Sequence, residues 1–222
     1  IEAEILGCNL LWSNDAPPTV TSHPLEAEPT VPEKLPSAED GRLPIALEVT
    51  RRLVKSVGSD TALYGLFCGP FTLASHLRGT NIFMDMFDDP EYVKRLLGYC
   101  TKVGKRMADL YAEAGVDVLA SVDPLVSQIS PDHFAEFLNE PYTELFGYIR
   151  TLRLPGSLFV CGDATKNVEE MCKTGPDGIS IDENIVLPEA KKITDRYNIV
   201  IAGNIPLASV MLFGNQMDNM KV

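Results

Sequence analysis

Polar side chains follow several short apolar stretches of this chain, each at the point where the stretch ends. In βα-folds the carboxyl ends of parallel strands carry the ligand-binding groups, so we expect these side chains to share one cavity. The candidates are Asp123, Cys161, Asp163, Asp182, Glu183 and Asn204. Several carboxylates in one concave site repel one another, and a bound cation or a cationic intermediate relieves that repulsion. The spacing therefore predicts a site for cation binding or for chemistry with a cationic intermediate.

Two further candidates, His76 and Arg78, lie just beyond a Gly69-Pro70 corner. A proline near the first turn starts a helix, and the free backbone N–H groups of that helix face the side of the strand end. A lone histidine near an apolar turn is more often a structural group than a catalytic one. Both interpretations of His76 stay open from the residues alone.

Strands and helices alternate along the chain, which indicates an α/β fold. Apolar stretches predict strands near residues 62–68, 116–122, 157–161, 178–182 and 198–202. Helical patterns span residues 37–58, 71–77, 88–114, 132–151, 167–174 and 187–197. Parallel strands require crossover helices, so the fold is either a doubly wound sheet or a (β/α)8 TIM-type barrel. The chain has no GxGxxG and no P-loop sequence, so nucleotide binding by a doubly wound sheet is unsupported and we favour the barrel.

Five strands do not close an eight-stranded barrel. We therefore predict that residues 1–222 form a single, incomplete barrel domain and are a fragment of a longer chain. Residues 1–38 are rich in proline and predict an extended amino-terminal segment that wraps a surface, with one short strand within residues 5–12. Residues 206–222 are predicted to be helix and loop.

Composition and charge narrow the class of protein. The 222 residues are 45% hydrophobic and carry a formal net charge of -12, which argues against nucleic acid and anionic membranes as partners. No apolar run approaches the roughly 20 residues that span a bilayer. The five cysteines form an odd set without CxxC spacing, as expected for reduced thiols in a cytoplasmic protein.

Short motifs between residues 60 and 210 resemble, in the same order, those of the uroporphyrinogen decarboxylase family. They are Cys68-Gly-Pro-Phe-Thr-Leu, Ala114-Gly-Val-Asp-Val-Leu, Asp123-Pro, Ile129-Ser-Pro-Asp-His-Phe, Val160-Cys-Gly-Asp, Gly178-Ile-Ser-Ile-Asp and Ala202-Gly-Asn. The resemblance implies a (β/α)8 barrel with one of two activities. One branch decarboxylates porphyrinogens without a cofactor, and the other contains zinc-dependent methyltransferases that act between a corrinoid protein and a thiol such as coenzyme M.

Several residues resemble the methyltransferase branch more closely than the decarboxylases. The decarboxylases carry a tyrosine where this chain has His76, and a serine where it has Asp123-Pro124. The methyltransferases carry a zinc-binding His-x-Cys pair where this chain has Phe159-Val160-Cys161, so the resemblance leaves Cys161 as the candidate metal ligand.

The resemblance leads to a methyltransferase hypothesis with assigned residue roles. His76, Asp123, Asp182 and Glu183 are the catalytic candidates, Arg78, Asp163 and Asn204 the substrate-binding candidates, and Cys161 the candidate ligand of zinc. The expected partner is a corrinoid protein or a small-molecule methyl acceptor, and a homo-oligomer is compatible with this hypothesis. Two alternatives stay open: porphyrinogen decarboxylation without a cofactor, and a non-catalytic barrel that binds a corrinoid protein or another partner. We also expect Cys161 to point into the cavity, with Asp123 close enough to share a ligand.

Overall fold

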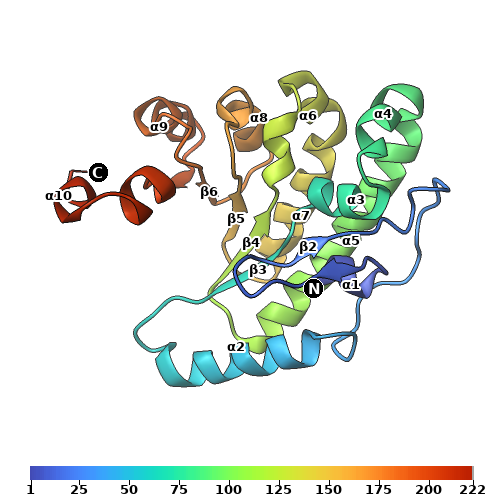
Figure 1. Ribbon diagram of the computed structural model, residues 1–222, viewed down its shortest axis with the longest axis horizontal. Coiled ribbons are helices and arrows are strands. Elements are labelled where there is room, and N and C mark those ends of the chain that lie inside the picture. The colour runs from blue at the N-terminus through green and yellow to red at the C-terminus, as the bar shows by residue number, and fades with distance from the viewer. Residues whose placement is uncertain (222) are drawn as a thin grey trace.

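Five parallel strands form the main sheet of the computed structural model, which describes residues 1–221 (Figure 1). Their bounds are β3 (Tyr64–Cys68), β4 (Val118–Val122), β5 (Gly156–Phe159), β6 (Gly178–Ser180) and β7 (Val200–Ala202). Each strand is hydrogen-bonded to the next one along the chain, in the order β3-β4-β5-β6-β7. This arrangement confirms the predicted strands and their parallel, consecutive order. The row of five does not close into a barrel.

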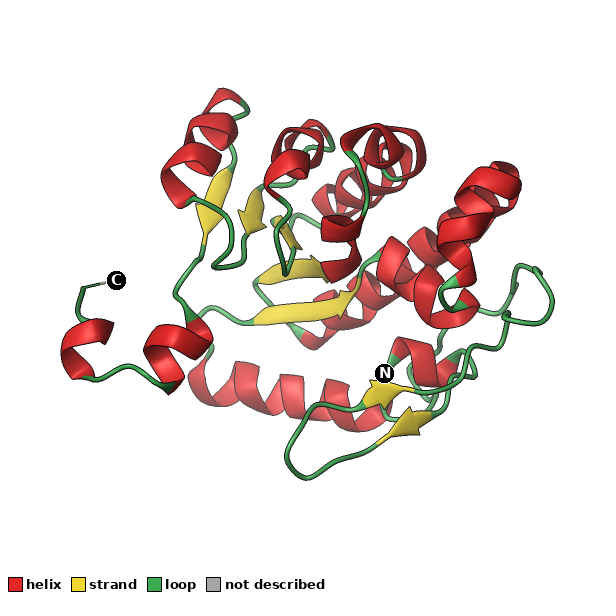
Figure 2. Cartoon of the chain, turned by 45° about the horizontal axis from the view of Figure 1, so that its top comes forward, coloured by secondary structure: helices red, strands yellow, loops and turns green. Residues whose placement is uncertain are grey.

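The helices alternate with the strands, and most lie on one side of the row of strands (Figure 2). Their bounds are α2 (Leu43–Val57), α3 (Pro70–Arg78), α4 (Asn81–Asp88), α5 (Pro90–Ala114), α6 (Pro131–Phe137), α7 (Asn139–Thr151), α8 (Val168–Lys173) and α9 (Leu187–Arg196), with short 3₁₀ turns η1 (Pro124–Gln128) and η2 (Thr165–Asn167). The prediction of one helix over residues 132–151 was wrong. Pro141 has no N–H to donate to Phe137, so the chain breaks at Leu138 into α6 and α7.

The amino-terminal segment is less extended than predicted. A short strand does lie within residues 5–12, but it comprises only β1 (Leu10–Leu11), which pairs antiparallel with β2 (Thr19–Val20), and a helical turn, α1 (Glu2–Ile5), precedes it. Gly7 adopts a φ of 101°, which a residue with a side chain rarely adopts, and this turn separates α1 from β1. The remainder lies along α5, where the hydroxyls of Tyr92 and Tyr99 donate to the carbonyls of Thr30 and Lys34.

The two faces of the sheet differ in what covers them. A Cβ atom on Gly156 would lie 2.9 Å from the Phe146 ring of α7, so this face of β5 packs against the helices. Leu158 on the same face is fully buried. The opposite face of the sheet carries Tyr64 and Leu66, which are 56% and 54% exposed. The hydrophobic core therefore lies between the strands and the helices. The opposite face of the sheet, which we call the inward face, is open.

The chain ends in a region of helix and loop, as predicted. A π-helix, η3 (Leu207–Leu212), and a short helix, α10 (Gln216–Asn219), follow β7, and Val222 lies outside the described residues. None of the helices within residues 1–221 combines the length and the apolar character that a membrane span requires.

Candidate functional site

A cavity of about 450 Å³ lies at the carboxyl ends of β5, β6 and β7. Its polar lining comprises Cys161, Asp182, Glu183, Asn184 and Asn204, and its apolar lining comprises Phe159, Val160, Ile181, Ile205, Leu207 and Met211. Four of the side chains that the sequence nominated are thus brought together. Such a volume suits a small-molecule ligand. We call this cavity the strand-end pocket.

The alternation of side chains along β5 places Phe159 and Cys161 in this pocket. Successive side chains of a strand point to opposite faces, and Leu158 packs against the helices, so Phe159 points away from them. Phe159 pairs with Ser180 of β6, which in turn pairs with Ala202 of β7, so these three residues form one layer at the strand ends. Cys161 follows on the same side and lines the pocket.

Close backbone approach brings β7 and its following loop against β6. Gly203 has a φ of 134°, and a Cβ atom there would lie 2.5 Å from the carbonyl oxygen of Ile181. Only glycine permits this approach. The next residue, Asn204, can then donate from its side-chain amide to the carbonyl of Ile185 while lining the pocket.

The two pocket carboxylates are held by backbone N–H groups. The pKa of Asp182 is lowered by the N–H groups of Gly162 and Asn184, which favour the ionised form. Glu183 accepts a hydrogen bond from the N–H of Leu207 at the start of η3. Within residues 1–221 no lysine or arginine forms an ion pair with either carboxylate. The pocket is therefore electrostatically negative.

Asp163 lies outside the pocket lining. Its side chain is exposed and accepts hydrogen bonds from the N–H and hydroxyl of Thr165, at 3.1 and 2.6 Å, which lower its pKa. It organises the turn into η2, and the negative charge of Asp182 acts on it from the pocket. The prediction that Asp163 lines the cavity was therefore wrong.

The chain does not provide a zinc site from its described residues. Phe159 occupies the inward position two residues before Cys161 and has no donor atom for a metal. No group of three or more His, Cys, Asp or Glu side chains within residues 1–221 is arranged to hold a metal ion. Burial, and then the charge of Asp182, raise the pKa of the Cys161 thiol, which keeps it protonated near neutral pH. Ligation by Cys161 therefore has no support from these residues, and we derive no step through zinc.

Asp123 does not share the pocket with Cys161, contrary to the prediction. It is fully buried, and its carboxylate accepts hydrogen bonds from the N–H groups of Phe71 and Thr72 at 2.9 Å. The hydroxyls of Thr72 and Tyr142 donate to it at 2.5 Å. Burial raises its pKa, and these four donors act against that rise. Both carboxylate oxygens of Asp123 are engaged in joining β4 to α3 and α7.

Arg78 also has a structural role instead of the predicted substrate contact. Its guanidinium is buried and donates to both carboxylate oxygens of Asp85, at 2.6 and 3.2 Å. It also donates to the backbone carbonyls of Leu25 and Glu26, at 2.6 and 2.7 Å. These bonds fasten the amino-terminal segment to α3 and leave the guanidinium no access to the pocket.

His76 lies beneath the same amino-terminal segment. Its backbone carbonyl accepts from the Cys8 thiol at 3.2 Å and is 2.8 Å from Nδ1 of His23. Burial, and then the nearby His23, lower the pKa of the His76 imidazole. His76 does not line the strand-end pocket, so its predicted position in the shared cavity was wrong.

The sequence argument missed the outer wall of the strand-end pocket. Ile205, Leu207 and Met211 belong to the loop after β7 and to η3. Their signal was a run of apolar residues soon after a strand end. Asn184, which is not among the candidates named from the sequence, also lines the pocket.

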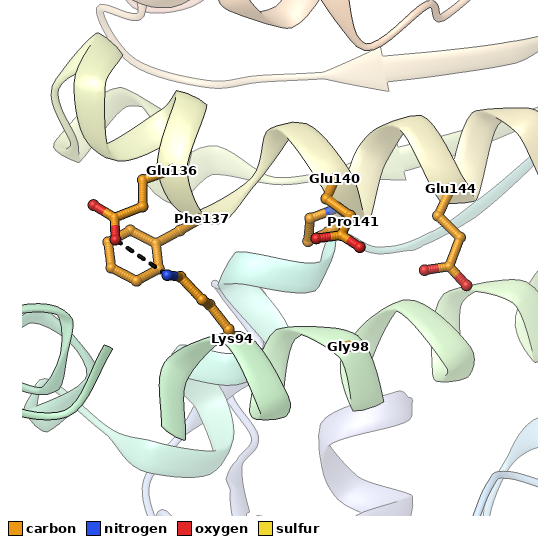
Figure 3. Close-up of a pocket in the computed structure, with 7 residues that line it drawn as sticks. All are labelled: Lys94, Gly98, Glu136, Phe137, Glu140, Pro141 and Glu144. Carbon is orange, nitrogen blue, oxygen red and sulfur yellow. Dashed lines mark ion pairs between the residues drawn. The ribbon is translucent and has the colours of Figure 1, made fainter. Parts of the chain in front are cut away.

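A second cavity, of about 300 Å³, lies between α5 and the α6–α7 pair, as Figure 3 shows. It is lined by Lys94, Gly98, Glu136, Phe137, Glu140, Pro141 and Glu144. Lys94 pairs with Glu91 and with Glu136, both at 3.3 Å, so its charge is already compensated. This groove belongs to the helical layer and has neither a thiol nor an imidazole in its lining. We therefore place the candidate chemistry in the strand-end pocket.

Consecutive parallel strands with crossover helices and a pocket at their carboxyl ends define an α/β protein of the barrel class. The chain belongs to the uroporphyrinogen decarboxylase (URO-D) family, whose family model matches residues 1–220. A solved methyltransferase from Methanosarcina mazei superposes with a TM-score of 0.86 at 26% identity, over 96% of this chain and 64% of that one. This likeness confirms the predicted TIM-type architecture.

The curated relatives place the chain nearer to the methyltransferase branch. The methylcobamide:CoM methyltransferase MtbA of Methanosarcina acetivorans is 30% identical over 98% of this chain and 65% of its own length. A methylated-thiol–coenzyme M methyltransferase of M. mazei is 31% identical over 82% of this chain and 50% of its own length. The uroporphyrinogen decarboxylase of Trichodesmium erythraeum is 27% identical over 87% of this chain and 56% of its own length. The chain thus spans about two thirds of the length of the first of these relatives.

Proposed function

We propose that this chain is part of an enzyme that moves a methyl group between a corrinoid protein and a small molecule, which is a thiol or a similar acceptor. The observation that carries this proposal is the strand-end pocket, where Cys161, Asp182, Glu183 and Asn204 converge above an apolar wall. The similarity to methylcobamide:CoM and methylated-thiol methyltransferases supports it.

The pocket residues supply positioning and exclusion of water. Methyl transfer is a displacement in line, so the rate depends on holding the small molecule with its reacting atom facing the methyl group. Phe159, Ile205 and Met211 offer an apolar surface that excludes water from the transfer. Asp182 and Asn204 supply fixed polar contacts that orient the small molecule. The corrinoid is a substrate carried by the partner protein, which would approach the open side of the pocket.

The partners and location follow from the same proposal. We propose a corrinoid protein as the macromolecular partner, a cytoplasmic location, and a single domain that includes residues 1–222. The net charge of -12 disfavours nucleic acid and anionic membranes, and a homo-oligomer is compatible with the proposal.

The direct test is methyl transfer by the full-length protein. The protein is mixed with a methylated corrinoid protein and coenzyme M, and the visible spectrum of the cobalt is followed as methyl–Co(III) is consumed. We expect consumption that depends on the protein, and a loss of roughly tenfold or more in Asp182→Asn and in Asn204→Ala. The matched control is Glu189→Gln on α9, whose exposed carboxylate pairs with Lys192 outside the pocket.

The alternatives predict other outcomes. Binding of the corrinoid protein with no methyl transfer in either direction would favour the non-catalytic interpretation. Release of carbon dioxide from a porphyrinogen, with no change in the cobalt spectrum, would favour decarboxylation. Zinc content is measured in the same preparations of the wild type and Cys161→Ala. Zinc that is present in the wild type and absent from Cys161→Ala would show that the thiol of Cys161 binds the metal.

A further inference from the structure

The loop that follows β5 carries two groups of the strand-end pocket. We call residues 160–167 the β5 loop, which ends with the 3₁₀ turn η2. Cys161 lines the pocket, and the N–H of Gly162 donates to the carboxylate of Asp182. The position of the β5 loop therefore determines where the thiol and this N–H group lie.

A buried amide joins the far end of the β5 loop to η1. Asn167 is fully buried, and its Nδ2 donates to the carbonyls of Val126 at 2.7 Å and Ile129 at 2.9 Å. Its Oδ1 accepts no hydrogen bond from any residue between 1 and 221. Because an unpaired buried acceptor is destabilising, the contribution of this amide to the fold lies in its two N–H groups. Asn167 therefore connects the loops that follow β4 and β5.

Gly162 brings the other end of the β5 loop against η1. It has a φ of 77°, and a Cβ atom there would lie 2.9 Å from Oγ of Ser127 in η1. The Ser127 hydroxyl is itself held, because it donates to the carbonyl of Pro124 at 2.8 Å. The absence of a side chain lets the backbone of Gly162 lie close to Ser127 while its N–H donates to Asp182.

The β5 loop and η1 are each held by further hydrogen bonds. Within the loop, the N–H and hydroxyl of Thr165 donate to Asp163 at 3.1 and 2.6 Å. In η1, the N–H of Leu125 donates to the hydroxyl of Thr72 in α3 at 3.4 Å. A displacement at Asn167 is therefore passed along the loop instead of being absorbed within it.

We propose that Asn167 is a positioning residue for methyl transfer: by joining the β5 loop to η1, it holds the N–H of Gly162 against the carboxylate of Asp182. This inference rests on the proposed function, in which Asp182 orients the small molecule. Asn167, Gly162 and Ser127 do not line the pocket. Asn167 therefore acts through Asp182 and not by contact with the reactants.

The first test measures the pKa of Asp182 in the full-length protein, by an NMR pH titration of the aspartate carboxyl carbons. Asn167→Leu keeps a side chain of similar size and removes both N–H bonds. We expect it to raise the pKa of Asp182 toward the ordinary value of 3.8, because the N–H of Gly162 no longer faces the carboxylate. The matched control is Thr101→Val, which removes a buried hydroxyl that donates to the carbonyl of Leu97 within α5 at 2.8 Å. This control is expected to leave the pKa of Asp182 unchanged.

The second test is a double-mutant cycle in the methyl-transfer assay. Asn167→Leu is expected to lower the rate roughly tenfold, because Asp182 is misplaced. The double variant with Asn167→Leu and Asp182→Asn is expected to match Asp182→Asn alone within about twofold, because a positioning residue has no further effect once the group that it positions is lost. Two independent losses would instead multiply. Thr101→Val is expected to retain the wild-type rate.

The outcomes distinguish positioning from a purely structural role. An unchanged pKa of Asp182 in folded Asn167→Leu overturns the inference, and so do losses of rate that multiply in the double variant. Circular dichroism identifies a variant that fails to fold. In that case Gly162→Ala replaces Asn167→Leu in both tests, because its Cβ atom would meet Ser127 and displace the same loop.

The outcomes also separate this inference from the function on which it rests. Methyl transfer that is the same in the wild type and in folded Asn167→Leu overturns the inference and leaves the proposed function standing. A wild-type protein without methyl transfer overturns the proposed function. In that case a raised pKa of Asp182 in Asn167→Leu still supports the positioning of this carboxylate by Asn167, and an unchanged pKa overturns it.

Discussion

Asp123 and Asp182 each follow a strand of the same parallel sheet, but their surroundings differ. Asp123, after β4, is fully buried and accepts four hydrogen bonds from α3 and α7. Asp182, after β6, is partly exposed, accepts from Gly162 and Asn184, and borders the strand-end pocket. The carboxyl end of β4 is therefore covered by packed helices, whereas the carboxyl end of β6 is open to the pocket.

The cause of the difference is what lies above each strand end. Gly69 has no side chain, and a Cβ atom there would lie 2.4 Å from the Cβ of Asp123, so α3 can approach closely enough to donate its first N–H groups. After β6 the chain turns away through Asn184, and Asp182 accepts from the N–H groups of Gly162 and Asn184, which lie in loops. Asp123 is therefore a structural group because the amino terminus of α3 covers it, whereas Asp182 borders the pocket.

The largest effect that tests this contrast is the loss of a buried acceptor. Asp123→Asn replaces a carboxylate oxygen by an amide N–H₂ facing donors, and we expect it to lower the free energy of unfolding by about 3–5 kcal/mol. Asp182→Asn is the matched substitution at the open end and is expected to cost less than about 1 kcal/mol. Urea unfolding followed by circular dichroism measures both. Equal losses of unfolding free energy in the two variants would show that Asp123 and Asp182 do not differ in their structural role.

A smaller effect is expected at Arg78, which fastens the amino-terminal segment to α3. Arg78→Lys keeps the charge but loses the planar contact with Asp85 and one or more carbonyl bonds, so we expect a loss of about 2–3 kcal/mol in unfolding free energy. Arg52→Lys, in an exposed i,i+4 pair with Glu48, is the control and is expected to change stability by about 0.5 kcal/mol or less. The rate of methyl transfer should be unchanged in Arg78→Lys; a specific loss of transfer with normal stability would restore its predicted substrate contact.

The smallest effect concerns pH at the open end. The N–H groups of Gly162 and Asn184 lower the pKa of Asp182 below its ordinary value of 3.8. Its stabilising contribution is therefore present above the unfolded pKa and is lost as the pH falls through the folded pKa. The ratio of the methyl-transfer rates of the wild type and Asp182→Asn should stay constant between about pH 5 and pH 8. A ratio that changes across this range would mean that Asp182 is not the ionised group facing the ligand.

The sequence by itself determined the order and direction of the strands and half of the candidate site. Short apolar runs stopped by Gly, Asp or Asn, with helical patterns between them, are local signals, and parallel pairing follows because each crossover contains a helix. The same strand-end rule nominated Cys161, Asp182, Glu183 and Asn204, which the fold does gather in one pocket. The resemblance to the family, and not the local pattern, indicated that Phe159 stands where the methyltransferases carry a metal-binding histidine.

Only the tertiary structure decided which nominated side chains are free. The donors that saturate Asp123 come from Thr72, which is 51 residues away in the sequence, and from Tyr142 on another helix. The guanidinium of Arg78 donates to backbone carbonyls 52 and 53 residues away, in a segment whose course no local pattern predicts. A hydrogen-bonding group is available to a ligand only after every partner brought near it by packing has been counted, and those partners are set by contacts between distant parts of the chain.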